Sequence, residues 1–243
     1  EWKYALGDKK WAWETVYDDH KWETVGLPHS FSIPYFMSKD FYTGYGWYRK
    51  QLNLSSEEVK RQVSLEFDGV FQEAEIFVNG HRAGYHVGGY TGFSIDITPF
   101  VRQGNNILAV RVDNLWRPDV APRAGEHVFS GGIYRDVRLV ITSPIHVGWY
   151  GTSVTTPGLK GSKGFASPVA VSTTLENHLP RTVTVSLQTA VVSPAGKVID
   201  SVTHVVTLGK NSRKDVRQTI PAILNPVLWS PEHPVEYQVV SSL

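Results

Sequence analysis

The chain has 243 residues, of which 41% are hydrophobic and 19% charged, and its 24 basic and 23 acidic residues leave a net charge of +1. So balanced a charge gives no electrostatic reason to expect binding to nucleic acid or to an anionic membrane surface, and no run of about 18 apolar residues predicts a transmembrane helix. The absence of cysteine excludes disulfide bonds, thiolate metal sites and a cysteine nucleophile.

Aromatic residues are concentrated in the first part of the chain. Of the 29 Phe, Tyr and Trp residues, 24 precede residue 144, and the remainder of the chain is instead rich in Val, Ser and Thr. This shift predicts two cores of different composition, one domain over residues 1–143 and a second over 144–243. The boundary is expected at Ser143-Pro144, because proline interrupts the strand-like run before it.

Hydrophobic residues recur with a period of two, which is typical of strands with one buried face. The segments concerned are Arg61–Asp68, Glu73–Val78, Asn106–Asp113, Val169–Leu175 and Val183–Leu187. Asn79-Gly80 suits a tight hairpin turn that needs positive φ at both positions, and Ser55–Arg61 is expected to form one helical turn. Short strands with turn signals between them predict an all-β fold of two sandwiches.

Two features could carry function. In the expected strand Ile133–Ile141, Arg135 shares the apolar face, so it forms either a structural ion pair or a contact with a ligand in a cleft. The stretch Trp116–Gly132 has no strand periodicity and is rich in Trp, Arg, Glu and His. It is either a sugar-binding loop, since aromatic faces and charged hydrogen-bonding groups recognise sugars, or a plain surface loop.

Other catalytic or binding motifs are weak. His29, His81, His86 and His127 lack the spacing of metal ligands, so we expect solvated or core histidines and no metal site. No nucleophile elbow supports a catalytic serine. No helix is expected after Gly88-Gly89, so this pair does not form a phosphate-binding loop.

Several stretches together closely resemble the N-terminal part of family 2 glycoside hydrolases, the β-galactosidase, β-glucuronidase and β-mannosidase group. They are Gly26-Leu-Pro-His29, Gly46-Trp-Tyr-Arg-Lys50, Leu65-Glu-Phe-Asp-Gly-Val70 with Val78-Asn-Gly80, Gly88-Gly-Tyr-Thr-Gly-Phe93 with Asp96-Ile-Thr98, Gly104-Asn-Asn-Ile-Leu-Ala-Val-Arg-Val-Asp-Asn114 and Gly131-Gly-Ile-Tyr-Arg-Asp-Val137. Val227-Leu-Trp-Ser-Pro231 and His233-Pro-Val-Glu-Tyr237 resemble the module that follows in that family.

The resemblance implies a sugar-binding jelly roll over residues 1–143 and an immunoglobulin-like β-sandwich over 144–243. The catalytic glutamates of the family lie on a TIM barrel, the acid/base after an asparagine, and this chain has neither an Asn-Glu dipeptide nor the length for a barrel. We therefore expect no catalytic residue, no cofactor and no hydrolysis by this chain alone. The expected partners are its barrel domain and, through the full-length enzyme, a β-galactoside or related glycan.

In the family, the loop before the Gly-Gly-Ile-Tyr-Arg block brings an acidic residue to the substrate sugar or its bound cation. The matching position is Glu126, with Arg123 and His127 beside it as further substrate-binding candidates and Tyr35 and Asp40 as weaker ones. In the family, the second module ends with one more strand, which leads into a characteristic sequence at the barrel entrance. No such sequence follows Tyr237–Leu243, so the second sandwich is expected to lack its last strand and to have an open edge.

Two functions are in competition. The chain is either the non-catalytic front portion of a family 2 glycoside hydrolase of the β-galactosidase type, or a free-standing carbohydrate-binding or adhesion module. It begins with Glu1 and carries no leader, which we interpret as a mature or excised segment. The resemblance to bacterial enzymes implies a periplasmic or secreted location.

Overall fold

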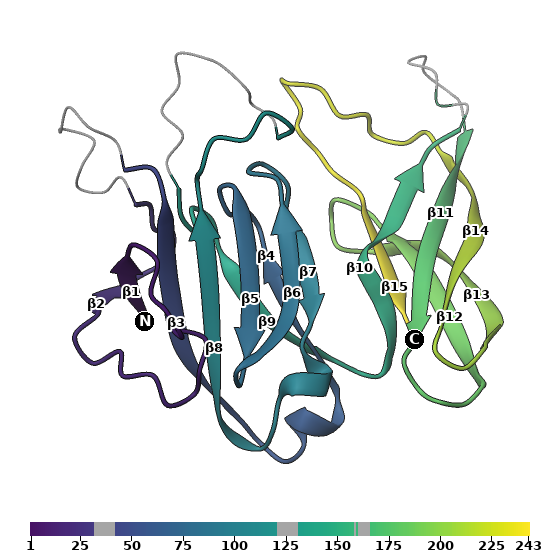
Figure 1. The fold of residues 1–243 in the computed structure, drawn as a ribbon. Coiled ribbons are helices and arrows are strands. Elements are labelled where there is room, and N and C mark those ends of the chain that lie inside the picture. Colours follow the sequence, from purple (N-terminus) through teal and green to yellow (C-terminus); the bar gives the residue numbers. More distant parts are fainter. Residues whose placement is uncertain (32–41, 121–130, 158, 160–165) are drawn as a thin grey trace. The chain divides into compact units, whose positions relative to one another are not determined.

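A computed structural model describes residues 1–31, 42–120, 131–157, 159 and 166–243, and it is built almost entirely from β-strands, as the sequence predicts. The chain forms two compact units, Glu1–Thr142 and Ser143–Leu243 (Figure 1). No helix in the described ranges has the length and apolar character needed to cross a membrane.

The first unit is a jelly-roll sandwich of two antiparallel sheets. The larger sheet has the order β2-β1-β3-β8-β5-β6 and the smaller one the order β7-β4-β9. The strands are β1 (Trp2–Leu6), β2 (Glu23–Val25), β3 (Tyr45–Leu54), β4 (Gln62–Phe67), β5 (Glu73–Val78), β6 (His81–Val87), β7 (Phe93–Asp96), β8 (Gly104–Asp113) and β9 (Val137–Thr142), with short 3-10 helices η2 (Glu58–Lys60) and η3 (Thr98–Phe100).

The core of this unit lies between the two sheets. In the smaller sheet, the alternate residues Val63, Leu65 and Phe67 of β4 point into the core and are buried. Every second residue of β5 and β8 in the larger sheet packs against them. Because side chains alternate across a strand, the period of two in the sequence becomes one buried face for each sheet. The expected alternation is confirmed here.

Strand β3 is buried on both faces in its first half. Tyr48 points into the sandwich, whereas Trp47 and Arg49 face a second apolar cluster in which Ala12, Trp13 and Tyr17 of the N-terminal segment take part. The buried Arg49 guanidinium pairs with Asp19 at 2.7 Å and donates to the carbonyl oxygens of Ala12, Glu14 and Tyr17. These bonds stabilise the buried charge, and they attach the N-terminal segment to the outer face of the larger sheet.

Two local predictions are confirmed. Asn79 and Gly80 join β5 to β6 with φ values of 51° and 84°, the positive values that the two-residue hairpin requires. The expected helical turn within Ser55–Arg61 is the 3-10 helix η2.

The expectation for Arg135 is wrong. Strand β9 begins only at Val137, and Arg135 is exposed in the preceding bend. The bend forms because the Tyr134 ring packs over Gly69 while its hydroxyl donates to the Gly89 carbonyl oxygen at 2.5 Å. The alternation therefore breaks before Arg135, and Arg138 makes the ion pair on this strand, with Asp68.

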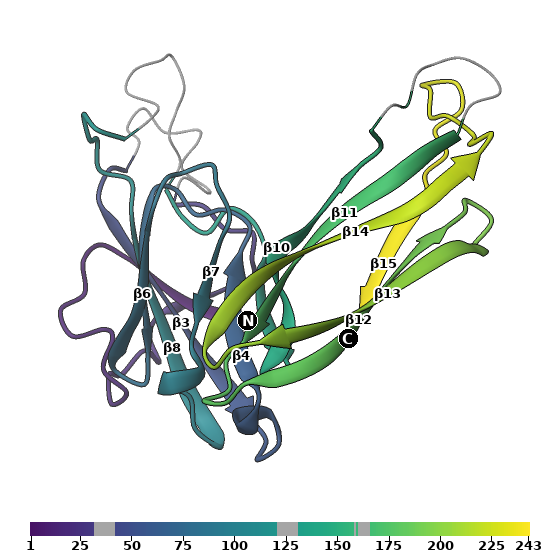
Figure 2. The same ribbon diagram turned by 90° about the vertical axis from the view of Figure 1, so that its right-hand side faces the viewer.

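The second unit is an immunoglobulin-like sandwich with the sheets β10-β11-β14 and β13-β12-β15 (Figure 2). Its strands are β10 (Ile145–Thr155), β11 (Ala166–Asn177), β12 (Val183–Val192), β13 (Val198–Leu208), β14 (Ser212–Leu224) and β15 (Gln238–Ser242). A buried hydrogen bond of 2.7 Å from Thr189 on β12 to Gln218 on β14 joins the two sheets between two apolar clusters. That this sandwich lacks its last strand and has an open edge stays a prediction.

One aromatic ring positions the end of the first sandwich. Phe31 is 1% exposed, and its ring lies against both Gly46 on β3 and Gly131. A Cβ atom at either glycine would overlap carbon atoms of the ring. Any larger residue at these positions therefore displaces Phe31.

We predict that Gly131→Ala lowers the free energy of unfolding by about 1–3 kcal/mol, the usual cost of overpacking a core. Gly26→Ala is the matched control, because no atom lies within 4 Å of its added Cβ, and we expect it to change stability by less than about 0.5 kcal/mol. Urea denaturation of both variants measures this. An equal effect of the two substitutions would contradict the packing argument. So would a Gly131→Ala/Phe31→Leu double variant whose loss of unfolding free energy equals the sum of the losses of the two single variants.

Candidate functional site

Four strand ends of the larger sheet meet at one edge of the first sandwich, which we call the loop edge. Tyr45 at the start of β3 lies opposite Asp113 at the end of β8, and Asp113 lies opposite Glu73 at the start of β5. Glu73 in turn lies opposite Val87 at the end of β6. Segments that are far apart in the sequence are thereby gathered at this edge (Figure 1).

The substrate-binding candidates Arg123, Glu126 and His127, like Tyr35 and Asp40, lie outside the described residues. Their flanking residues are described. The amide of Phe31 donates to the Gly131 carbonyl oxygen at 2.8 Å, and the amide of His29 donates to that of Ile133 at 2.8 Å. The residues that precede position 32 and those that follow position 130 are therefore hydrogen-bonded side by side at the loop edge.

A hydrogen-bonded histidine–tyrosine pair contacts these flanking segments. His29 Nδ1 lies 2.8 Å from the Tyr48 hydroxyl, and the Tyr48 hydroxyl accepts the Ile133 amide at 3.4 Å. Burial lowers the pKa of His29 and raises that of Tyr48, so both side chains are neutral near pH 7. His29 is thus a packed core-type histidine, and the described groups able to hold a metal ion include neither it nor His81 or His86.

A charged pocket of about 240 Å³ lies beside the loop edge on the larger sheet. Its lining residues are Tyr45, Glu73, Glu75, Arg82, Tyr85, Arg111 and Asp113. Arg111 is held by both carboxylate oxygens of Asp8 and by Glu75 at 3.3 Å, and its guanidinium stacks 4.0 Å from the centre of the Tyr45 ring. The pocket is a network of paired charges.

The network extends to the start of the stretch Trp116–Gly132. The Glu73 carboxylate forms an ion pair with Arg117 and accepts the Tyr85 hydroxyl at 2.6 Å, and Arg117 also pairs with Asp119 at 3.2 Å. Trp116 beside it is 66% exposed. An exposed aromatic face next to guanidinium and carboxylate groups suits a sugar, because sugars present both apolar faces and hydroxyl groups.

Among the pocket residues, Asp113 has the most strongly raised pKa. Burial and then the negative charge of Glu73 raise its pKa to about 6, against the opposing effects of the Leu115 amide bond and of Arg111 and Arg117. A carboxyl group that titrates near pH 6 can exchange a proton under physiological conditions. Its neighbour Glu73 is already held by Arg117 and Tyr85, so the two do not form an open acid pair around a sugar ring of the kind that retaining glycosidases use.

Comparison with known families matches both units. Residues 8–144 match the sugar-binding domain of the glycosyl hydrolases family 2, and residues 155–243 match a second family 2 domain. The chain belongs to glycosyl hydrolase family 2. The resemblance seen in the sequence motifs is therefore confirmed.

The relatives are bacterial glycosidases. The chain is 30% identical over its whole length to a β-galactosidase of Bacteroides ovatus and 33% identical over 90% of its length to a β-glucuronidase of Bacteroides fragilis. Its structure matches a Bacteroides uniformis β-glucuronidase with a TM-score of 0.92 and 33% identity over 98% of the chain. The chain spans only 29%, 32% and 29% of these three proteins, respectively. It thus corresponds to the N-terminal part of a family 2 glycosidase.

Sequence reasoning missed the charged pocket. Its lining residues come from four strands, β3, β5, β6 and β8, and sheet pairing brings them together. Glu75 and Arg111, for example, lie opposite each other although they are 36 residues apart in the sequence. The sequence pattern did indicate polar faces on these strands, because charged residues alternate with the apolar core residues. They are Glu73 and Glu75 on β5 and Arg111 and Asp113 on β8. Their meeting depends on the register of β5 with β8.

We predict that Asp113→Asn stabilises the chain above pH 6 and has little effect near pH 4. The pKa of Asp113 is raised from 3.8 in the unfolded chain to about 6 in the folded chain, so stability is lost as the pH rises through this interval. Each pKa unit corresponds to about 1.4 kcal/mol, and partial exposure reduces the expected gain to about 1–2 kcal/mol. Thermal unfolding at pH 4 and pH 7.5 measures it, with the exposed Asp136→Asn as control. A gain of equal size at both pH values would contradict the shift.

Proposed function

We propose that this chain is the non-catalytic front portion of a retaining family 2 glycosidase, with a β-galactoside as the substrate of the whole enzyme. The observation that carries the proposal is the family match over both units, combined with the fact that the chain spans about 30% of its relatives' length. The first unit would form part of the rim of the sugar site and the second would support a catalytic barrel domain. We also propose a periplasmic or secreted location for the whole enzyme.

The loop edge is the part of the chain that would face the sugar. Its hydrogen-bonded segments, at Phe31 and Gly131, flank the stretches that contain Glu126 and the other candidates. A carboxylate and an imidazole at Glu126 and His127 would hydrogen-bond sugar hydroxyl groups, and Arg123 would add a guanidinium. Such contacts orient a substrate, whereas the bond-breaking acids would come from the barrel.

A β-glucuronidase is the second candidate. Several relatives and solved structures that match the chain are named β-glucuronidases, among them those of Bacteroides fragilis and Bacteroides uniformis. A glucuronide carries a carboxylate where a galactoside has a hydroxymethyl group, and its 4-hydroxyl group has the opposite configuration. The carboxylate needs a cation for recognition. Comparing the two sugars in one assay separates the candidates.

We expect the purified 243-residue chain to hydrolyse neither 4-nitrophenyl β-D-galactoside nor 4-nitrophenyl β-D-glucuronide above the buffer rate. Binding of the methyl glycosides, followed by NMR shift perturbation, should be weaker than about 1 mM, because a rim alone makes few contacts. Hydrolysis would refute the non-catalytic role. Affinity tighter than about millimolar would favour the free-standing carbohydrate-binding module instead.

The role of the rim is tested in a longer polypeptide that joins this chain to a family 2 catalytic domain. Glu126→Gln should raise KM for the preferred glycoside by about tenfold, the effect of one lost charged hydrogen bond. The matched control is Glu57→Gln, an exposed glutamate that forms an ion pair with Lys60, and it should leave KM unchanged. An unchanged KM in Glu126→Gln would remove this residue from the site.

A further inference from the structure

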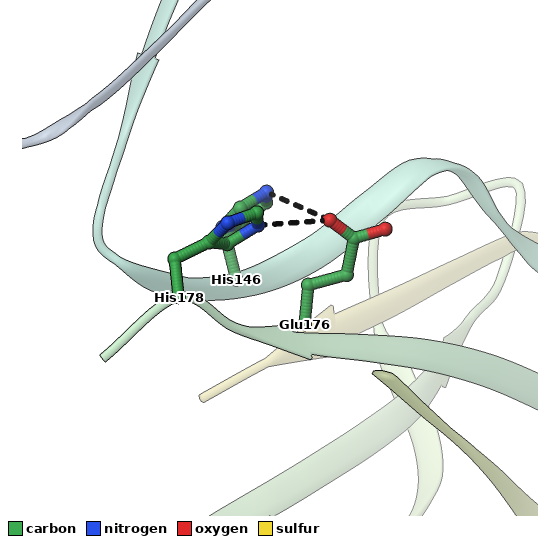
Figure 3. Close-up of side chains that lie close together, drawn as sticks. All are labelled: His146, Glu176 and His178. Atoms are coloured by element: carbon green, nitrogen blue, oxygen red, sulfur yellow. Dashed lines mark hydrogen bonds and ion pairs between the residues drawn. The ribbon is translucent and has the colours of Figure 1, made fainter. Parts of the chain in front are cut away.

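A second polar cluster lies in the second unit, where β10 begins and β11 ends. His146 on β10 stands directly opposite Glu176 on β11 in the antiparallel register. His178 follows Glu176 by two residues and therefore lies on the same face of the chain. Figure 3 shows the three side chains converging, with both imidazole rings beside one carboxylate.

The distances are those of potential metal ligands. His178 Nε2 lies 3.1 Å and His146 Nε2 lies 3.9 Å from the same oxygen of Glu176. The two rings are stacked with centroids 5.3 Å apart and planes inclined by 11°. One ligand atom from each residue lies within 4.8 Å of the other two.

Contacts with the backbone position the three residues. His146 Nδ1 lies 3.0 Å from the Ser143 carbonyl oxygen and must donate to it, which places the lone pair of the neutral ring on Nε2, facing Glu176. The His178 amide donates to the Pro144 carbonyl oxygen at 2.9 Å. Gly148 leaves room for the carboxylate, because a Cβ atom there would lie 2.7 Å from Glu176 Oε1.

The cluster is also accessible. The side chains of His146, Glu176 and His178 are 18%, 25% and 34% exposed, so an ion can enter without unfolding the strands. Arg213 lies opposite Glu176 on β14, yet among the described residues the close side-chain contacts of the Glu176 carboxylate are with the two imidazoles. The carboxylate is therefore directed toward the imidazoles.

We propose that His146, Glu176 and His178 bind a divalent transition-metal ion, with Zn²⁺ as the best fit. Two imidazoles and one carboxylate are a zinc ligand set, and three protein ligands leave a fourth position for water. Ligand atoms about 2.0–2.1 Å from a tetrahedral zinc ion lie roughly 3.3 Å apart. The ligand atoms now lie within 4.8 Å of one another, and rotation of the partly exposed imidazoles would bring them to that separation.

Bound zinc would strengthen the start of the second unit. The cluster already contacts Ser143 and Pro144, the first residues of that unit, through His146 and His178. An ion shared by β10 and β11 ties this segment to the end of β11. This inference is independent of the glycosidase proposal, since it uses only residues of the second unit.

The test uses the tag-free chain, stripped of metal with EDTA and titrated with ZnCl₂ by isothermal calorimetry and by thermal unfolding. We expect one zinc ion per chain, a dissociation constant on the order of micromolar, and a rise in the unfolding temperature of the second unit. Mg²⁺ should produce neither signal, because imidazole ligands do not suit it.

Variants locate the site. His146→Ala, His178→Ala and Glu176→Gln should each weaken zinc binding at least about tenfold, whereas His204→Ala, which removes an exposed histidine on β13, should not. Circular dichroism checks that each variant is folded. As a readout on the unaltered chain, zinc should shift the imidazole ¹⁵N signals of His146 and His178 but not that of His204. Absence of binding at millimolar zinc, or equal shifts at all histidines, would overturn the proposal.

Discussion

The packing of Phe31 against two glycines is the constraint on which the first unit's loop edge depends. Its ring fills the space beside Gly46 and Gly131 and also contacts the rings of Tyr4, Tyr42 and Tyr48. Because protein interiors are close-packed, a ring in that position leaves no room for a Cβ atom at either glycine. The contact holds Gly131 next to Phe31, and the hydrogen bonds between their segments follow from it.

Much of the fold was predictable from the sequence because it depends on local rules. The period of two produced the buried faces of β4, β5 and β8, and Asn79-Gly80 produced the hairpin between β5 and β6. The prediction for Arg135 failed because it assumed an unbroken strand from residue 133. The bend is caused by Tyr134 packing on Gly69, a contact between residues 65 positions apart that no local pattern reveals.

The sites were less predictable than the fold. Resemblance to family motifs identified Glu126 and its neighbours as candidates, but the charged pocket arises from strand register, which brings Asp113 between Glu73 and Tyr45. The same is true of the histidine cluster. Glu176 and His178 carried a signal in their spacing of two, whereas His146 joins them only because β10 pairs with β11. Long-range pairing decides where such polar groups meet.

Amide hydrogen exchange of the unaltered chain tests the central claim most directly. If Phe31 packing fixes the loop edge, the amides of His29, Phe31 and Gly132, which donate hydrogen bonds there, should exchange as slowly as the core amides of β8. Exchange as fast as that of an exposed turn at these three amides would show that the edge is not held together, and the account would be contradicted.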